Sequence, residues 1–145
     1  MNIFTIGFTK STAENFFKRL EGSNVIRVVD VRLKADSQLA GFAKRKDLAF
    51  FLPRVSAIEY TYEPLLAPSA QILESYRKGL MTWSSYADAY LCLISDRKVE
   101  ERISPETLDG ACLLCSEDTA HHCHRRLAAE YLQTKWVSPI GVTHL

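Results

Sequence analysis

The sequence lacks a marked excess of charge of either sign. Its 18 lysines and arginines are nearly balanced by 17 aspartates and glutamates, so the formal net charge is +1. Proteins that grip duplex DNA through many phosphates carry a clear basic excess, and general nucleic-acid binding is therefore not favoured. A hydrophobic fraction of 47% is enough for one ordinary core, and a charged fraction of 24% argues against global disorder.

Long apolar runs are also missing. The N-terminus has neither a basic region nor a long apolar region, which argues against a secretory signal, and no run approaches the length of a membrane span. We therefore expect a cytoplasmic protein with no membrane association, whose four cysteines are thiols. The chain contains no repeat, linker or low-complexity tract, and residues 1–145 are expected to form a single domain.

The first third of the chain has the pattern of a parallel sheet. Residues 3–6 indicate a buried strand, and Ser11 and Glu14 form a capping-box pattern before a helix that reaches about Leu20. Residues 25–31 are β-branched and predict a second strand. A strand, a helix and a strand in close succession predict a single-domain α/β fold, a three-layer sandwich with a mainly parallel sheet and helices on both faces.

The rest of the chain continues this alternation. Residues 34–46 are interpreted as a long loop, and Pro53 limits the next helix to about residues 47–52. The remaining predicted elements are a strand at 58–62, helices after Ser69 and Thr82, a buried strand at 111–115, a helix at 124–132 and a last strand at 142–145.

Polar residues follow the ends of two predicted strands, and parallel sheets bind ligands at that edge. The helix that begins near residue 124 directs its free N–H groups toward the same edge. We expect eight side chains to meet there: Cys115, Glu117, Cys123 and His124 as candidate catalytic groups, and Asp30, Arg32, Arg125 and His144 as candidate substrate-binding groups. Glu117 and Arg125 are expected to pair, because an unpaired buried charge is costly.

Several polar or sulfur-containing residues have purely structural interpretations. Asp30 and Arg32 can form a simple ion pair at a strand end. Cys92 and Cys112 lie in apolar stretches and are expected to be buried, unreactive core residues. Residues 44–46 (Lys-Arg-Lys) are interpreted as solvated surface, and His121 and His122 as a solvated loop. Trp83, Tyr86 and Tyr90 lie at helical spacing, which favours the core.

The motifs resemble those of the domain of unknown function 488 family. In chain order they are residues 5–7 (Thr-Ile-Gly), 29–32 (Val-Asp-Val-Arg), 113–117 (Leu-Leu-Cys-Ser-Glu), 123–125 (Cys-His-Arg) and His144. The specific part is Cys-x-Glu followed shortly by Cys-His-Arg. Members often have a glycine-rich stretch after the third strand, where this chain has residues 65–69 (Leu-Leu-Ala-Pro-Ser). The resemblance implies an α/β sandwich with a shared polar site, and it implies no activity.

Three functions are compatible with such a site. The first is an enzyme for a small anionic or nucleotide-like ligand, in which a cysteine thiolate is the nucleophile and Arg32 and Arg125 hold the anion. The spacing does not match the Cys-x5-Arg loop of cysteine phosphatases and rhodaneses, because His121 lies between Cys115 and the first arginine.

The second function is a zinc site built from Cys115, Cys123 and a nearby histidine, although the chain has no Cys-x2-Cys or His-x3-His pair. The third is a nucleic-acid or protein binding module in which the Glu–Arg pairs are structural. The sequence assigns no cofactor, no metal ligand and no oligomeric state, and the reaction stays open among these alternatives.

Overall fold

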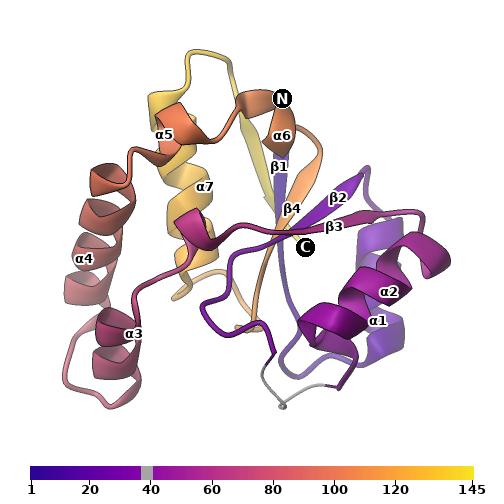
Figure 1. The fold of residues 1–145 in the computed structure, drawn as a ribbon, viewed down its shortest axis with the longest axis horizontal. Coiled ribbons are helices and arrows are strands. Elements are labelled where there is room, and N and C mark those ends of the chain that lie inside the picture. The colour runs from indigo at the N-terminus through magenta and orange to yellow at the C-terminus, as the bar shows by residue number, and fades with distance from the viewer. Residues whose placement is uncertain (37–40) are drawn as a thin grey trace.

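The computed structural model describes residues 1–36 and 41–145, and its centre is a five-stranded sheet (Figure 1). All strand pairs are parallel, and the strand order is β3-β2-β4-β1-β5. The strands are β1 (Asn2–Gly7), β2 (Arg27–Asp30), β3 (Glu59–Tyr62), β4 (Ala111–Cys115) and β5 (Gly141–His144). The predicted α/β class is therefore confirmed.

Helices cover both faces of this sheet, as Figure 1 shows. On one face, α1 (Ala13–Glu21) and α2 (Arg45–Val55) enclose a core with Phe16 and Leu52. On the other face, α4 (Trp83–Asp96) and α7 (His124–Lys135) enclose a core with Tyr90 and Leu132. The remaining helices are α3 (Ala70–Arg77), α5 (Val99–Arg102), α6 (Pro105–Leu108), and the 3-10 turns η1 (Gly41–Ala43) and η2 (Pro64–Leu66).

The central strand β4 positions the candidate site. All five of its residues are buried, which fits an apolar strand covered on both faces. It lies between β1 and β2, with Cys115 opposite Gly7 and Leu114 opposite Asp30. Because the strands are parallel, their carboxyl ends meet at one edge of the sheet, and Cys115 leaves the sheet beside the end of β2.

Three local expectations were wrong. Thr12, rather than Ser11, caps α1, and its hydroxyl accepts a hydrogen bond from Asn15 N at 3.1 Å. Strand β2 is shorter than the predicted residues 25–31. Helix α2 continues through Pro53 to Val55. Pro53 has no N–H to donate to the carbonyl of Ala49. Both residues are exposed, so water can replace that hydrogen bond.

The cysteine expectation was half right. Cys112 on β4 is fully buried, as predicted, but Cys92 on α4 is exposed. The buried residues of α4 follow a four-residue spacing at Tyr86, Tyr90 and Ile94, and Cys92 lies off that stripe. The expected loop at 34–46 includes residues 37–40, which lie outside the described residues. None of the helices in the described ranges has the length and apolar character needed to cross a membrane.

Candidate functional site

A cavity of about 540 Å³ opens at the carboxyl edge of the sheet. Its wall contains five of the eight predicted site residues: Arg32, Cys115, Glu117, Cys123 and His124. They arrive from the segments after β2 and β4 and from the start of α7, as the parallel topology requires. The structure therefore brings the thiols, the imidazole and one arginine to a single concave surface.

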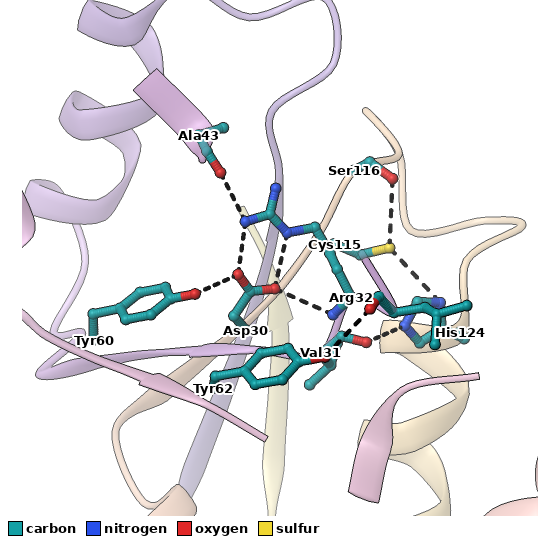
Figure 2. Close-up of polar contacts among 10 residues, drawn as sticks. Asp30, Val31, Arg32, Ala43, Tyr60, Tyr62, Cys115, Ser116 and His124 are labelled. Carbon is teal, nitrogen blue, oxygen red and sulfur yellow. Dashed lines mark hydrogen bonds and ion pairs between the residues drawn. The ribbon is translucent and has the colours of Figure 1, made fainter. Parts of the chain in front are cut away.

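Cys115 and His124 form the central contact of this surface (Figure 2). The Cys115 Sγ lies 3.7 Å from His124 Nδ1, and both residues are at least 95% buried. His124 Nε2 is 2.8 Å from the carbonyl oxygen of Val31. A carbonyl only accepts hydrogen bonds, so Nε2 must carry a proton and Nδ1 faces the sulfur. This orientation lets Nδ1 exchange a proton with Cys115.

The surroundings favour the charged forms of this pair. A hydrogen bond from the Cys123 thiol lowers the pKa of Cys115 well below its ordinary value; burial opposes this shift and His124 adds to it. Burial alone would lower the pKa of His124, but the negative charge on Cys115 raises it overall. The contact between the two cysteines raises the pKa of Cys123 well above its ordinary value. These shifts favour a thiolate at Cys115 beside an imidazolium at His124, with Cys123 kept as a neutral thiol.

Arg125 lies directly behind these sulfurs. Its side chain is 1% exposed, and it donates to the Glu117 carbonyl oxygen at 2.6 Å, to Thr5 Oγ1 at 3.3 Å and to Cys123 Sγ at 3.7 Å. The predicted pairing of Arg125 with the Glu117 carboxylate was wrong. Glu117 is exposed, and only its backbone carbonyl meets the guanidinium, because the loop after β4 turns its main chain toward α7.

The loop after β4 also lies close to β1. Thr9 N donates to the Ser116 carbonyl oxygen at 3.0 Å. A Cβ added at Gly7 would lie 1.5 Å from the Glu117 carbonyl oxygen and 2.8 Å from Arg125 Nη1. Gly7 is therefore the residue that allows the main chain of the loop to pass over the end of β1.

Asp30 and Arg32 form a buried ion pair beside the cavity (Figure 2). The Asp30 carboxylate is fully buried and accepts from Arg32 Nε at 2.9 Å, from Arg32 Nη2 at 2.6 Å and from the Tyr60 hydroxyl at 2.6 Å. Arg32 Nη2 also donates to the Ala43 carbonyl oxygen at 2.7 Å. The interpretation as a strand-end ion pair is confirmed, while Arg32 still forms part of the cavity wall.

His144 lies apart from the cavity. On β5 its Nδ1 is 2.7 Å from Thr5 Oγ1, the hydroxyl that also accepts from Arg125. His144 as a whole is exposed, but its ring is partly buried. This partial burial lowers the pKa of His144, and the positive charge of Arg125 lowers it further. Thr5, a fully buried polar residue on β1, thus connects His144 to Arg125. Neither His144 nor Arg125 belongs to the cavity wall.

The outer part of the cavity uses residues that the sequence interpretation had assigned elsewhere. Arg45 lines the wall with its guanidinium 4.5 Å from the centre of the Tyr62 ring. Tyr86 faces the cavity although it is almost fully buried, and His122 lines it while stacking on Trp83 at 4.8 Å. Lys34, Tyr76 and Arg77 also line this part of the cavity. The sequence feature that could have indicated this outer part of the cavity is the presence of arginines and tyrosines on neighbouring helices.

The sulfur and imidazole groups also form a candidate metal site. The ligand atoms of Cys115, Cys123 and His124 all lie within 4.8 Å of one another, the one such group of three found in the described ranges. Two thiolates and an imidazole are a donor set that zinc accepts. The Nε2–H bond to Val31 would orient such a ligand in the usual way.

Comparisons with known proteins support the resemblance noted from the motifs. No curated protein matches the chain, and no solved structure does. The description "domain of unknown function DUF488" matches residues 12–132, which contain seven of the eight candidate site residues, all except His144. This match covers most of the 145 residues, and the chain belongs to the DUF488 family.

Proposed function

We propose that the protein is an enzyme that acts on a small anionic, nucleotide-like ligand, with Cys115 as its nucleophile. The observation that carries the proposal is the 3.7 Å contact between Cys115 Sγ and His124 Nδ1 at the wall of a 540 Å³ cavity. A cavity of about 300–1,000 Å³ is typical of small-molecule sites. A thiolate made stable by its surroundings and facing such a cavity is typical of covalent catalysis.

Cys115 and His124 together support a hydrolytic reaction in two steps. In the first, the Cys115 thiolate bonds to the electrophilic atom of the substrate, and the leaving group departs with its electron pair and takes a proton from His124 Nδ1. In the second, water attacks the covalent intermediate and gives one proton to neutral His124, which restores the thiolate and the imidazolium. The net reaction adds one water across the broken bond. Glu117 at the cavity wall offers a second base.

The cavity wall supports an anionic ligand with an aromatic part. Three exposed cations, Lys34, Arg45 and Arg77, line it, and none of them belongs to an ion pair among the described residues. Guanidinium groups bind phosphate and carboxylate by two parallel hydrogen bonds. Tyr62 and Tyr76 line the wall beside these charges and offer aromatic contact area for a base, although Arg45 lies 4.5 Å from the centre of the Tyr62 ring and Tyr76 stacks on Tyr86 at 4.8 Å.

Thermal unfolding with and without adenosine monophosphate or inorganic phosphate tests the ligand class. At a hundredfold excess over Kd, binding to the folded state alone raises the Tm by roughly 5–10 °C. Arg45→Ala should reduce this shift. Arg54→Ala is the matched control, since Arg54 also lies on α2 and over an aromatic ring, 4.0 Å from the centre of Phe50, but outside the cavity wall.

Alkylation by iodoacetamide tests the nucleophile. Cys115 should react at pH 7 and be protected by the ligand that raises the Tm, because both occupy the cavity. The proposal fails if neither anion raises the Tm of the wild type. It fails equally if Arg45→Ala and Arg54→Ala change the shift by the same amount, or if Cys115 is alkylated no faster than a protein thiol with an ordinary pKa.

A further inference from the structure

The proposed function uses one of the two buried sulfurs in the cavity wall and gives Cys123 no chemical step. We propose that Cys115 and Cys123 form a reversible disulfide on exposure to hydrogen peroxide, with Cys115 as the attacking thiol and Cys123 as the resolving thiol. The inference shares Cys115 with the proposed function but needs no substrate, so the two can fail separately.

The positions of the two sulfurs support this pairing. They lie within 4.8 Å of each other, and both residues line the cavity although they are only 4% and 2% exposed. A peroxide molecule is small enough to reach them through the cavity. Cys112, the other buried cysteine, lies on β4 outside the cavity wall. The geometry therefore selects one pair.

The backbone at Cys123 lets its sulfur move toward Cys115. Cys123 is the N-cap of α7, with an extended backbone (φ −138°, ψ 138°), and its side chain makes no capping hydrogen bond. A residue at this position precedes the helical turn, so rotation about its χ1 angle is not restricted by an earlier turn. Closing the gap to the length of a disulfide bond needs this rotation and a small shift of the loop.

The segment between the cysteines is held at its start. The Ser116 carbonyl accepts from Thr9 N at 3.0 Å, and the Glu117 carbonyl accepts from Arg125 Nη1 at 2.6 Å. These bonds fix the main chain after Cys115 against β1 and α7. Formation of the bridge thus leaves the sheet edge in place, and the cavity changes only where the sulfurs meet.

The chemistry balances with hydrogen peroxide as the oxidant. The Cys115 thiolate attacks one peroxide oxygen, the O–O bond breaks, and the departing hydroxide takes the Nδ1 proton of His124 as the first water. The product is a sulfenic acid on Cys115. The Cys123 sulfur then attacks the Cys115 sulfur, the S–O bond breaks, and the hydroxide leaves with the Cys123 proton as the second water. Each sulfur loses one electron, and the two peroxide oxygens gain them.

Two neighbours favour these steps. Arg125 Nη1 lies 3.7 Å from Cys123 Sγ and stabilises negative charge that develops on it during the second step. His124 Nδ1 lies 3.7 Å from Cys115 Sγ and supplies the proton that the departing hydroxide takes in the first step.

Peptide mapping by mass spectrometry tests the inference. Because Cys92 is exposed and can form bridges between molecules, the experiment uses the full chain with Cys92→Ser, reduced and treated with chelator. One equivalent of hydrogen peroxide should join the peptides of Cys115 and Cys123 within one chain, with the loss of two hydrogen masses. Dithiothreitol should reverse the change.

Two further substitutions in the same background assign the roles. With Cys123→Ser, oxidation should stop at a sulfenic acid on Cys115 that dimedone traps. Cys112→Ala is the matched control for a buried cysteine outside the cavity and should form the same bridge as the background. In the wild type, Cys115 should be oxidised about tenfold faster than Cys92 or more, because His124 Nδ1, 3.7 Å from Cys115 Sγ, supplies a proton to the departing hydroxide.

Three results overturn the inference. The first is a background protein in which no bridge between Cys115 and Cys123 forms, or in which a sulfenic acid persists. The second is equal oxidation rates at Cys115 and Cys92. The third is one zinc ion per chain that is lost in Cys123→Ser, which makes the pair a metal site. If an anion still raises the Tm while no bridge forms, this inference fails and the proposed function stands.

Discussion

The buried ion pair of Asp30 and Arg32 makes a quantitative prediction. In Asp30→Asn the shape of the side chain is kept, but its negative charge is lost and the amide faces the donors of Arg32 and Tyr60. The guanidinium, which is 5% exposed, is then a buried charge without a counter-ion. Breaking a buried pair on one side costs about 3–5 kcal/mol, and we expect Asp30→Asn to lose that much free energy of unfolding.

The ion pair between Arg27 on β2 and Glu59 on β3 is a matched control. Glu59 accepts from Arg27 Nε at 2.9 Å and from Nη2 at 2.6 Å, the same distances at which Asp30 accepts from Arg32. The Glu59 side chain, however, is 66% exposed. Exposed pairs contribute about 0–1 kcal/mol, so Glu59→Gln should lose less than about 1 kcal/mol.

Urea denaturation at pH 7 measures both losses, with the slope of each transition compared to detect a change in the unfolded state. The double substitution Asp30→Asn with Arg32→Met should lose less than Asp30→Asn alone, because it removes the stranded charge. The reasoning is refuted if Asp30→Asn and Glu59→Gln lose equal free energy, since geometry and not burial would then set the cost.

Three further predictions concern single groups. Gly7→Ala should lose at least about 3 kcal/mol, because its Cβ would meet a carbonyl oxygen at 1.5 Å, while Gly41→Ala, with no atom of the described residues within 4 Å of its Cβ, should change the urea midpoint little. Tyr90→Phe should lose about 1–3 kcal/mol in the same assay by leaving a buried carbonyl without its donor. The lowered pKa means that Cys115 stays a thiolate as the pH falls, so its alkylation rate should decline at lower pH than that of a cysteine in a short unstructured peptide, and coincident pH profiles would contradict this.

The sequence predicted the layers of the fold well because they depend on strong local signals. All five predicted strands overlap the observed ones, with buried β-branched and apolar runs marking β1, β2 and β4, and Ser69 and Thr82 do cap the helices that follow them. The errors came from competition between nearly equal local choices. Ser11 and Thr12 both suit an N-cap, and only the path of the chain from β1 decides between them.

The candidate site was predicted in part for topological reasons. Parallel strands deliver Cys115 to the edge where α7 begins, and this alone places Cys123 and His124 nearby. The outer wall could not be found this way, because Arg45 and Tyr86 come from helices whose docking depends on long-range packing. The Glu117–Arg125 pairing failed because backbone carbonyls compete with carboxylates for a guanidinium, and the sequence does not show where carbonyls point.

The position of Arg125 connects the fold to the charge of the cavity. Its N–H groups are satisfied by a hydroxyl, a carbonyl and a sulfur, and the ion pairs among the described residues do not include it. Hydrogen bonds to neutral acceptors do not cancel a positive charge, so this charge acts on the nearby sulfurs. When Cys115 is a thiolate, its one negative charge lies near two positive ones, the protonated His124 and Arg125 behind the wall, which leaves an excess of positive charge at the inner end of the cavity. An anionic ligand bound in the cavity would neutralise that excess, and the same excess favours loss of a proton from Cys123 when it attacks an oxidised Cys115.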